Sequence, residues 1–385
     1  SVSLASDNST LAVTFSEAVF NTDGGSGALE ANDFAFSISG GTASLSSATP
    51  SSISASGNVY TLGISITGTP NGSETLTVNP VDNGIYDAAG NEASTSQSNN
   101  TVTLNDKTAP TVTYSPAHNA TGAAVDRNIT ITFNEAARKI DDSALTDSNV
   151  DALITLKTTN ASGSDIAFEA TFSGTLTSGV ITINPSSDFS SEQVVYVAIG
   201  ATVEDANDNA ITASSATFTV VDASATSVTF SPVDGAKAIA VSSNVTLTFG
   251  EAVRKIDDSA ITDTNVDALI TLKSTNASGD DIGFDATINS GKTVITVNPT
   301  NDFSSEQVVY AAIGATVEDD ANNAISATSI TFTTADVTAP ATPTGLVATV
   351  GNGKVVLVWN ANTESDMASY KVYGGTSASP TTVLA

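Results

Sequence analysis

Acidic and amide side chains occur in the same order in three parts of the chain. In the middle part they are Asp106, Glu135 in the run Phe-x-Glu-Ala, and Asp205 with Asn209 in the run Asp-x-x-x-Asn. Carboxylate and amide oxygens are the ligands that hard cations prefer, and Ca²⁺ takes about six to eight of them. We therefore predict structural Ca²⁺ sites from the following residues: Glu17, Asp87, Asn91, Asp106, Glu135, Asp205, Asn209, Asp222, Glu251, Asp319 and Asn323.

The spacing of these residues recurs because the chain repeats one unit. The run SEQVVYVAIGATVEDANDNAI at 191–211 returns as SEQVVYAAIGATVEDDANNAI at 305–325, and a weaker copy, ETLTVNPVDNGIYDAAGNEA, lies at 74–93. Each copy is an apolar strand pattern followed by an acidic loop. Internal repeats of this length indicate an array of similar domains.

The composition favours an all-β array with an acidic surface. Strand formers and turn formers dominate, and the hydrophobic content of 40% argues against disorder. Only 12 of 385 residues are Lys or Arg, and the formal net charge is -29. This charge excludes nucleic acid and anionic lipid as partners. Because these negative charges repel one another unless salt screens them or divalent cations neutralise them, we expect a salty, calcium-containing medium.

The chain has no cysteine, which excludes disulfides, thiolate metal sites and cysteine nucleophiles. No apolar run approaches the roughly 20 residues of a membrane span. Ser1 already lies within a strand pattern, and the last residues lie inside another domain. We therefore expect a segment of a larger protein, whose signal peptide was removed or lies outside this segment.

Short alternating apolar runs, separated by turn residues, predict the elements that position the candidate ligands. Leu11, Val13 and Phe15 are typical of a half-buried strand. Each unit carries about seven such runs, which is the pattern of an immunoglobulin-like sandwich. We predict an all-β fold of tandem immunoglobulin-like β-sandwiches arranged as beads on a rod. The predicted domains are 1–106, with a truncated first strand, 107–221, 222–336, and 337–385, where a different sandwich begins.

The Phe-x-Glu-Ala runs at Phe15, Phe133 and Phe249, each followed by Asp-x-x-x-Asn, resemble the bacterial Ig-like domains that occur in tandem in S-layer proteins and large adhesins. The final segment resembles the first half of a fibronectin type III domain, with Trp359 in the place of that family's core tryptophan. These resemblances imply an exported bacterial protein with a stalk-like or surface role. The loops at 205–209 and 319–323 lack the glycine that usually precedes the asparagine.

The sandwich topology brings the candidate ligands to one end of each domain, because the loop after strand B, the F–G loop and the entry of strand A share that end. A cation bound by the linker residue Asp106 together with Glu135 and Asp205 would lock neighbouring domains, with an expected affinity of about 10⁻⁴ to 10⁻³ M. The alternative is that Asp205 and Asn209 only shape an Asx-type loop, that Glu135 caps a turn and that Asp106 is solvated.

Other chemistry has weaker support in the sequence. His118 is the only histidine, and without a cysteine no nucleophile and base can be assembled in the usual ways, so we predict no catalytic residue. Asp141 and Asp142 could serve a glycosidase, but the same pair returns in the next repeat, which favours a scaffold feature. We interpret Lys139 as the partner of Asp141 in a surface ion pair rather than in an isopeptide crosslink.

The function predicted from these observations is a non-enzymatic extracellular structural array, such as a stalk, S-layer or fibre segment at a cell surface. Its partners would be neighbouring domains or copies of itself, and strand addition from a neighbouring subunit is one route to a filament. Two alternatives stay open. The domains could bind glycan or a host or cell-surface protein, or they could be the accessory region of a secreted hydrolase.

Overall fold

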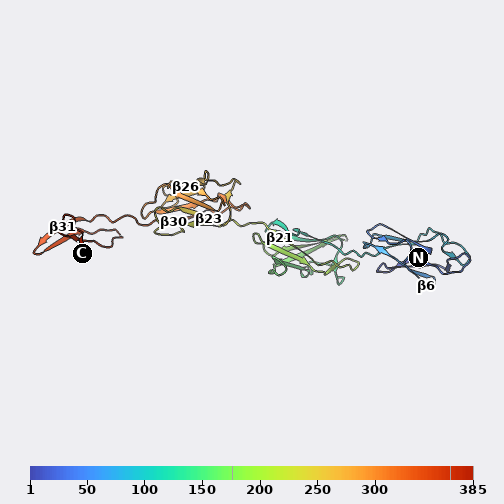
Figure 1. Cartoon of the computed structure of the whole chain (residues 1–385). Coiled ribbons are helices and arrows are strands. Elements are labelled where there is room, and N and C mark those ends of the chain that lie inside the picture. Colours follow the sequence, from blue (N-terminus) through green and yellow to red (C-terminus); the bar gives the residue numbers. More distant parts are fainter. Residues whose placement is uncertain (176, 365, 385) are drawn as a thin grey trace. The chain divides into compact units, whose positions relative to one another are not determined.

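The computed structural model describes residues 1–175, 177–364 and 366–384. The chain divides into two compact units, Ser1–Ala223 and Ser224–Ala385, built of strands in sandwich layers (Figure 1). No helix among the described residues is long and apolar enough to cross a membrane. The predicted all-β class with Ig-like domains in tandem is confirmed. The described residues include three 3₁₀ turns: η1 (Ala31–Asp33), η2 (Asp151–Leu153) and η3 (Val266–Leu269).

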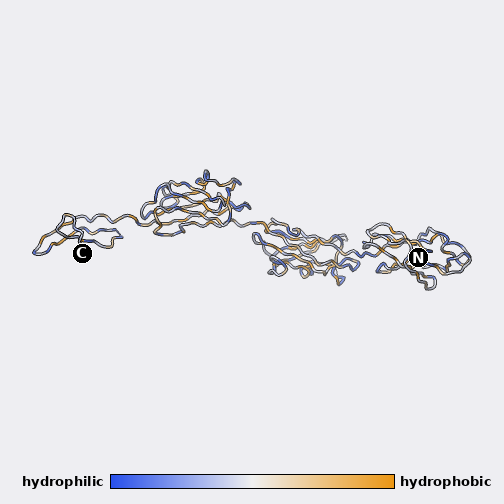
Figure 2. The backbone as a smooth tube through the Cα atoms, in the orientation of Figure 1, coloured by the Kyte–Doolittle hydropathy of each residue, from blue (hydrophilic) through white to orange (hydrophobic). Residues whose placement is uncertain are grey.

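In the second domain, the strands from Val112 to Val220 form two four-stranded sheets and one short two-stranded ladder. Ile129, Ile131 and Phe133 are fully buried, and the threonines between them are half-exposed. Because successive side chains of a strand point to opposite faces, this alternation turns one face of each sheet to the core. Figure 2 shows hydrophobic residues along the strands and hydrophilic residues in many of the loops. The sheets, in spatial order, are β12 (Val112–Ser115), β14 (Ile129–Phe133), β18 (Gly179–Pro185) and β17 (Phe168–Gly174), and β13 (Ala120–Ala123), β21 (Ser214–Val220), β19 (Val194–Ile199) and β16 (Ile154–Thr158).

The third domain, which lies in the unit Ser224–Ala385, repeats this plan. Where the second domain has β13 paired in parallel with β21, the third has a single parallel bridge between Ile239 and Thr334. Its core contains Phe303 and Phe332 edge to face, with ring centroids 5.7 Å apart. Its sheets are β22 (Val228–Ser231), β23 (Val245–Phe249), β27 (Val294–Pro299) and β26 (Phe284–Ile288), and β25 (Ile270–Ser274), β28 (Val308–Ile313) and β30 (Thr328–Thr333).

The first domain, residues 1–106, differs from the others in its opening segment. Strand β1 ends at Leu4 and β2 begins at Thr10, whereas the longer connection between β12 and β14 carries β13. The first domain therefore has no strand that corresponds to β13 among its described residues. Its main sheets are β1 (Val2–Leu4), β2 (Thr10–Thr14), β7 (Val59–Gly63) and β6 (Ile53–Ser56), and β11 (Thr101–Thr103), β9 (Thr75–Pro80) and β4 (Phe34–Ser39), with a minor ladder of β5 (Ser44–Leu45) and β8 (Ile66–Thr67).

The last segment, residues 337–384 as described, has two two-stranded ladders. The ring of Trp359 packs on Tyr370, with centroids 5.1 Å apart. All eight residues of the first strand are exposed, and the buried core clusters of the described residues include no residue of this segment. The ladders are β31 (Thr344–Gly351) with β32 (Lys354–Asn360), and β33 (Tyr373–Gly374) with β34 (Thr382–Val383).

Candidate metal centre

The acidic loop of the second domain follows the short strand β20 (Val203–Glu204), which pairs with β15 (Arg138–Lys139). Asp205 is only 2% exposed, and its Oδ1 accepts hydrogen bonds from the backbone N–H of Asn207 at 2.7 Å and of Asn209 at 2.9 Å. The side-chain amide of Asn209 donates to Oδ2 at 2.8 Å. The loop thus has the Asx-type geometry that the alternative interpretation expected, and this geometry fixes the carboxylate of Asp205.

The loops without the expected glycine keep the same backbone geometry. In the first domain, Gly90 precedes Asn91 and has a φ of 84°. Asp208 and Asn322 occupy the corresponding positions with φ values of 65° and 71°. Asp and Asn tolerate this left-handed conformation better than most residues with a side chain. The missing glycine therefore does not change the loop.

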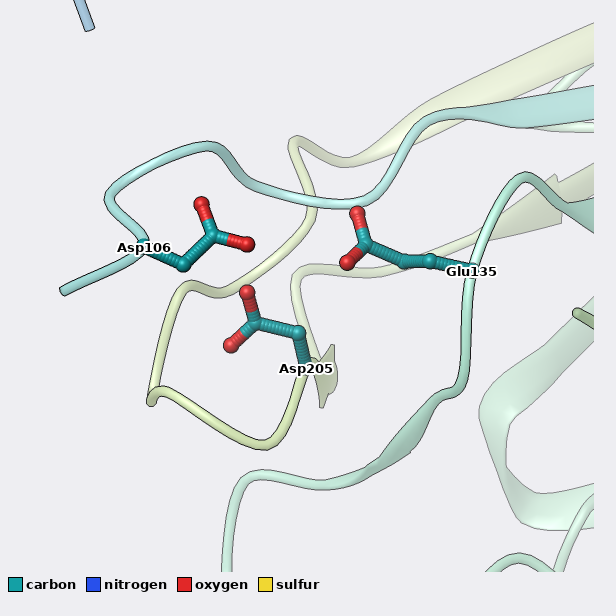
Figure 3. A group of neighbouring side chains, drawn as sticks. All are labelled: Asp106, Glu135 and Asp205. Atoms are coloured by element: carbon teal, nitrogen blue, oxygen red, sulfur yellow. The ribbon is translucent and has the colours of Figure 1, made fainter. Parts of the chain in front are cut away.

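Three carboxylates meet at the entry to the second domain. Asp106 comes from the linker, Glu135 from the turn after β14, and Asp205 from the loop after β20; Figure 3 shows their carboxylates gathered at one place. Each offers an oxygen, and these oxygens lie within 4.8 Å of one another. Since Ca²⁺–oxygen distances are about 2.3 to 2.6 Å, two ligands of one ion lie up to about 5 Å apart, and the three carboxylates fit that limit.

The electrostatics of this group are unfavourable without a cation. Burial raises the pKa of Glu135, and the negative charges of Asp205 and Asp106 raise the pKa further. A carboxylate responds in this way when its environment disfavours the ionised form. A divalent cation among the three oxygens would reverse that preference, because it attracts all three charges.

The linker residue of this group is held from both sides. The carbonyl oxygen of Pro70 in the first domain accepts hydrogen bonds from the Lys107 N–H at 2.8 Å and the Thr108 hydroxyl at 3.0 Å. From the second domain, the side-chain amide of Asn209 donates to the Asp106 carbonyl oxygen at 3.2 Å. Asp106 therefore presents its carboxylate from a segment that is attached to both domains of the first unit.

A second group of carboxylates, which the sequence analysis did not find, lies on the β15–β20 ladder. Asp142, Glu204 and Asp208 also bring three oxygens within 4.8 Å. Here the guanidinium of Arg138 lies among them, 2.7 Å from Asp142 and 3.2 Å from Glu204. The chain thus supplies its own cation to this group. The signal in the sequence was Arg138 itself, four residues before Asp142, and its repeat as Arg254 before Asp258.

The predicted ligands of the first domain are only partly brought together. Asp87 and Asn91 form the same loop, with the Asp87 Oδ1 accepting the Asn91 N–H at 2.8 Å. Glu17 is exposed and lies two residues before β3 (Val19–Phe20), whose Val19 pairs with Asp87 of β10 (Tyr86–Asp87). With two carboxylates and one amide, this set offers fewer oxygens than the Asp106 group.

The predicted ligands of the third domain fall in both units. Within the second unit, Glu251 and Asp319 offer carboxylate oxygens within 4.8 Å of each other. Asp319 is fully buried and accepts the Asn323 N–H at 2.9 Å. Asp222 belongs to the first unit, where it accepts a hydrogen bond from the Ser191 hydroxyl at 2.6 Å. The short ladder of β24 (Arg254–Lys255) with β29 (Val317–Glu318) again precedes the acidic loop.

Comparison with known proteins places this fold in a family. The model of the bacterial Ig-like domain matches residues 106–220 and 222–334, more than half of the chain. The chain belongs to the bacterial Ig-like domain family. The resemblance predicted from the Phe-x-Glu-Ala and Asp-x-x-x-Asn runs is thereby confirmed for these segments. The fibronectin-like character of the last segment stays a prediction.

Solved structures to which the chain is similar include a surface layer protein, an adhesin and tandem Ig domains of titin. Domains 1–6 of the surface layer protein SbsC are 12% identical over 91% of this chain and 61% of that chain, with a TM-score of 0.19. The Yersinia pseudotuberculosis adhesin InvE is 12% identical over 62% of this chain and 66% of that one, with a TM-score of 0.24. Tandem Ig domains of titin are 6% identical over 59% and 97%, with a TM-score of 0.24. No curated protein sequence matches the chain.

Proposed function

We propose that these bacterial Ig-like domains form a non-enzymatic structural segment of an extracellular surface protein, and that Ca²⁺ stiffens the junction between the first and second domains. The observation that carries this proposal is the Asp106–Glu135–Asp205 group, in which a linker carboxylate faces two carboxylates of the next domain. The family, the tandem repeat and the acidic surface support a structural role.

Each residue of the group has a distinct task in this proposal. Asp205 is held by its loop and would supply a fixed oxygen on the domain side, while Glu135 would supply a second oxygen from the turn after β14. Asp106 would add the oxygen that makes the linker part of the coordination shell. Bound Ca²⁺ would neutralise the group and restrict the linker, because the ligands of a chelate cannot move independently.

The proposal is tested by the thermal stability of the chain with calcium and then with excess chelator. Calcium at about 100 times its dissociation constant should stabilise the second domain by about 2.7 kcal/mol, and the chelator should reverse this shift. Glu135→Gln should raise the calcium concentration needed for this stabilisation at least tenfold, because the substitution removes a charged ligand while keeping the side-chain volume.

The matched control is Asp142→Asn, which changes a carboxylate of the group that Arg138 already neutralises. It should leave the calcium response as in the parent chain. An equal loss of response in both variants, or no calcium-dependent change in melting or in hydrodynamic stiffness of the parent chain, rejects the calcium site. The surface role is tested separately, by antibody labelling of intact producing cells.

A further inference from the structure

The first domain has an unpaired sheet edge along β11. The Leu104 N–H donates to the Glu74 carbonyl at 3.0 Å, and the Asn100 carbonyl accepts the Val78 N–H at 3.0 Å, so alternate residues of this segment face β9. By that alternation the N–H and C=O groups of Thr101 and Thr103 face away from the sheet. Among the described residues, no partner bonds these outward groups.

The same groups are paired in the other two domains. In the second domain, the Val220 N–H donates to the Gln193 carbonyl, in the same way as the Leu104 N–H donates to the Glu74 carbonyl in the first domain. Val220 therefore corresponds to Leu104, and Thr217, three residues earlier, corresponds to Thr101. The Thr217 carbonyl accepts the Asn119 N–H at 2.7 Å, just before β13. In the third domain, Gly235 donates to the Thr331 carbonyl at the corresponding position, at 2.7 Å. The position beside this strand is therefore normally filled by a segment that runs parallel to it.

The core beside the open edge is also incompletely covered. Val13 and Phe15 of the first domain are half-exposed, whereas their counterparts Ile131 and Phe133 are fully buried. A cavity of about 450 Å³ opens there, lined in part by Val2, Val13, Phe15, Phe34, Pro80 and Asn100.

The second domain fills the corresponding space with a larger side chain. Tyr114 pairs with Ile131 in the same way as Val2 pairs with Val13, so Tyr114 takes the place of Val2. The Tyr114 hydroxyl donates to the Ser214 carbonyl oxygen at 2.8 Å. The first domain thus combines free backbone groups with an adjacent apolar hollow. These two features together are those of a site for β-strand addition.

We propose that the β11 edge accepts strand β31 from a second copy of the chain, running parallel to β11 as β13 runs parallel to β21. β31 is the longest strand that the structure describes, and its residues TGLVATVG are all exposed and uncharged. An uncharged strand is suited to a contact between two copies of the chain, because chains with a net charge of -29 repel each other. The most exposed valine of β31, Val350 at 81%, provides an apolar group for the hollow.

This contact joins different surfaces of the two copies, so it does not close on itself and can propagate from copy to copy. The inference rests on the proposed structural role only in naming a copy of the chain as the partner. It does not depend on calcium, whose effect is measured on the melting of one chain.

The first test is sedimentation velocity of the full chain over a dilution series. The parent chain should form a concentration-dependent series of oligomers. Thr103→Pro should raise the concentration needed for association at least tenfold, because it removes an outward N–H without removing a bond to β9. Val350→Asp should do the same by placing a charge on the donor strand, and Val233→Asp, at a valine that is 66% exposed in the third domain, should not.

A crosslinking experiment serves as an independent check if Thr103→Pro disturbs the first domain. The chain has no cysteine, so an equimolar mixture of the Thr101→Cys and Thr349→Cys chains, whose side chains lie on the solvent face of the extended sheet, should give a mixed disulfide dimer on mild oxidation. A mixture of Thr101→Cys with Val233→Cys should give at least tenfold less. A chain that stays monomeric at all concentrations, equal crosslinking in the two mixtures, or association that survives Val350→Asp overturns the proposal and leaves the calcium-stiffened structural role intact.

Discussion

Two groups of three carboxylates lie at the second domain, and they differ in one residue, Arg138, which is close to only one of them. Arg138 lies among Asp142, Glu204 and Asp208, and its guanidinium offsets their mutual repulsion. The charged groups that raise the pKa of Glu135 are both carboxylates. The Glu135 group therefore gains more from an external cation than the Arg138 group does.

The raised pKa of Glu135 predicts how the metal-free chain responds to pH. Its folded-state pKa lies above the ordinary value of 4.5, so the ionised side chain destabilises the fold. This destabilisation is fully present above the folded-state pKa and is relieved as the pH falls towards 4.5. In chelator, the melting temperature of the second domain should rise as the pH falls towards 4.5, and Glu135→Gln should reduce that rise. A pH profile that Glu135→Gln leaves unchanged would contradict this assignment.

Removal of Arg138 should destabilise the second domain through the buried carboxylate that it faces. Glu204 is only 6% exposed, and without Arg138 its charge has two acidic neighbours. We expect Arg138→Ala to cost about 2 to 3 kcal/mol, less than a fully buried pair because Arg138 is partly exposed. Calorimetry of the full chain measures this. Adding Glu204→Gln to the variant should restore most of the loss, and a double variant as unstable as the single one speaks against the ion-pair explanation.

At the scale of elements, one loop needs its glycine while its two counterparts do not. Gly90 has a φ of 84°, and a Cβ there would collide with the carboxylate of Asp23. Gly90→Ala should therefore destabilise the first domain by about 1 to 2 kcal/mol. Gly200→Ala is the control, because a Cβ there meets its nearest neighbour, Thr202, at an ordinary 3.5 Å. Calorimetric melting of both variants compares the two positions, and equal losses would argue against backbone strain at Gly90.

The sequence predicted the long elements and the loops better than the short ladders. Alternation such as Ile129, Ile131, Phe133 identifies a strand because its period of two is visible over several residues. The meeting of Glu135 with Asp205 also followed from the sandwich topology. The β15–β20 ladder did not, because each of its strands has only two residues, which is too short for any periodicity. The ion pairs of Arg138 depend on that ladder and were missed with it.

The opening of the first domain shows a different limit of sequence reasoning. The shortage of residues before Phe15 was visible, but which element it affects depends on pairing across the domain. The structure shows that β1 still pairs with β2, whereas a partner for the outer edge of β11 is lacking among the described residues. Pairing between residues about 100 positions apart leaves no local pattern in a sequence.

At the scale of the whole molecule, charge and partner choice are linked. With a net charge of -29, copies of the chain repel one another. At physiological ionic strength, salt limits the range of this repulsion to about 8 Å. Contacts between copies are then favoured where short-range backbone bonds and apolar groups dominate. An uncharged strand that meets an open sheet edge satisfies this condition.

The parallel pairing of β13 with β21 has a mechanical consequence. β13 lies near the entry of the second domain and β21 near its exit, so tension applied to the chain ends loads the hydrogen bonds between them in shear. Bonds such as Asn119 N–H to Thr217 O and Val221 N–H to Ala123 O must then yield together. Among the described residues, the first domain has no such parallel pairing, and side-chain bonds such as that between Asn8 and Asn105 connect its opening segment to the end of β11. In single-molecule stretching it should rupture at a lower force than the second domain, and would act as the extensible link of the array.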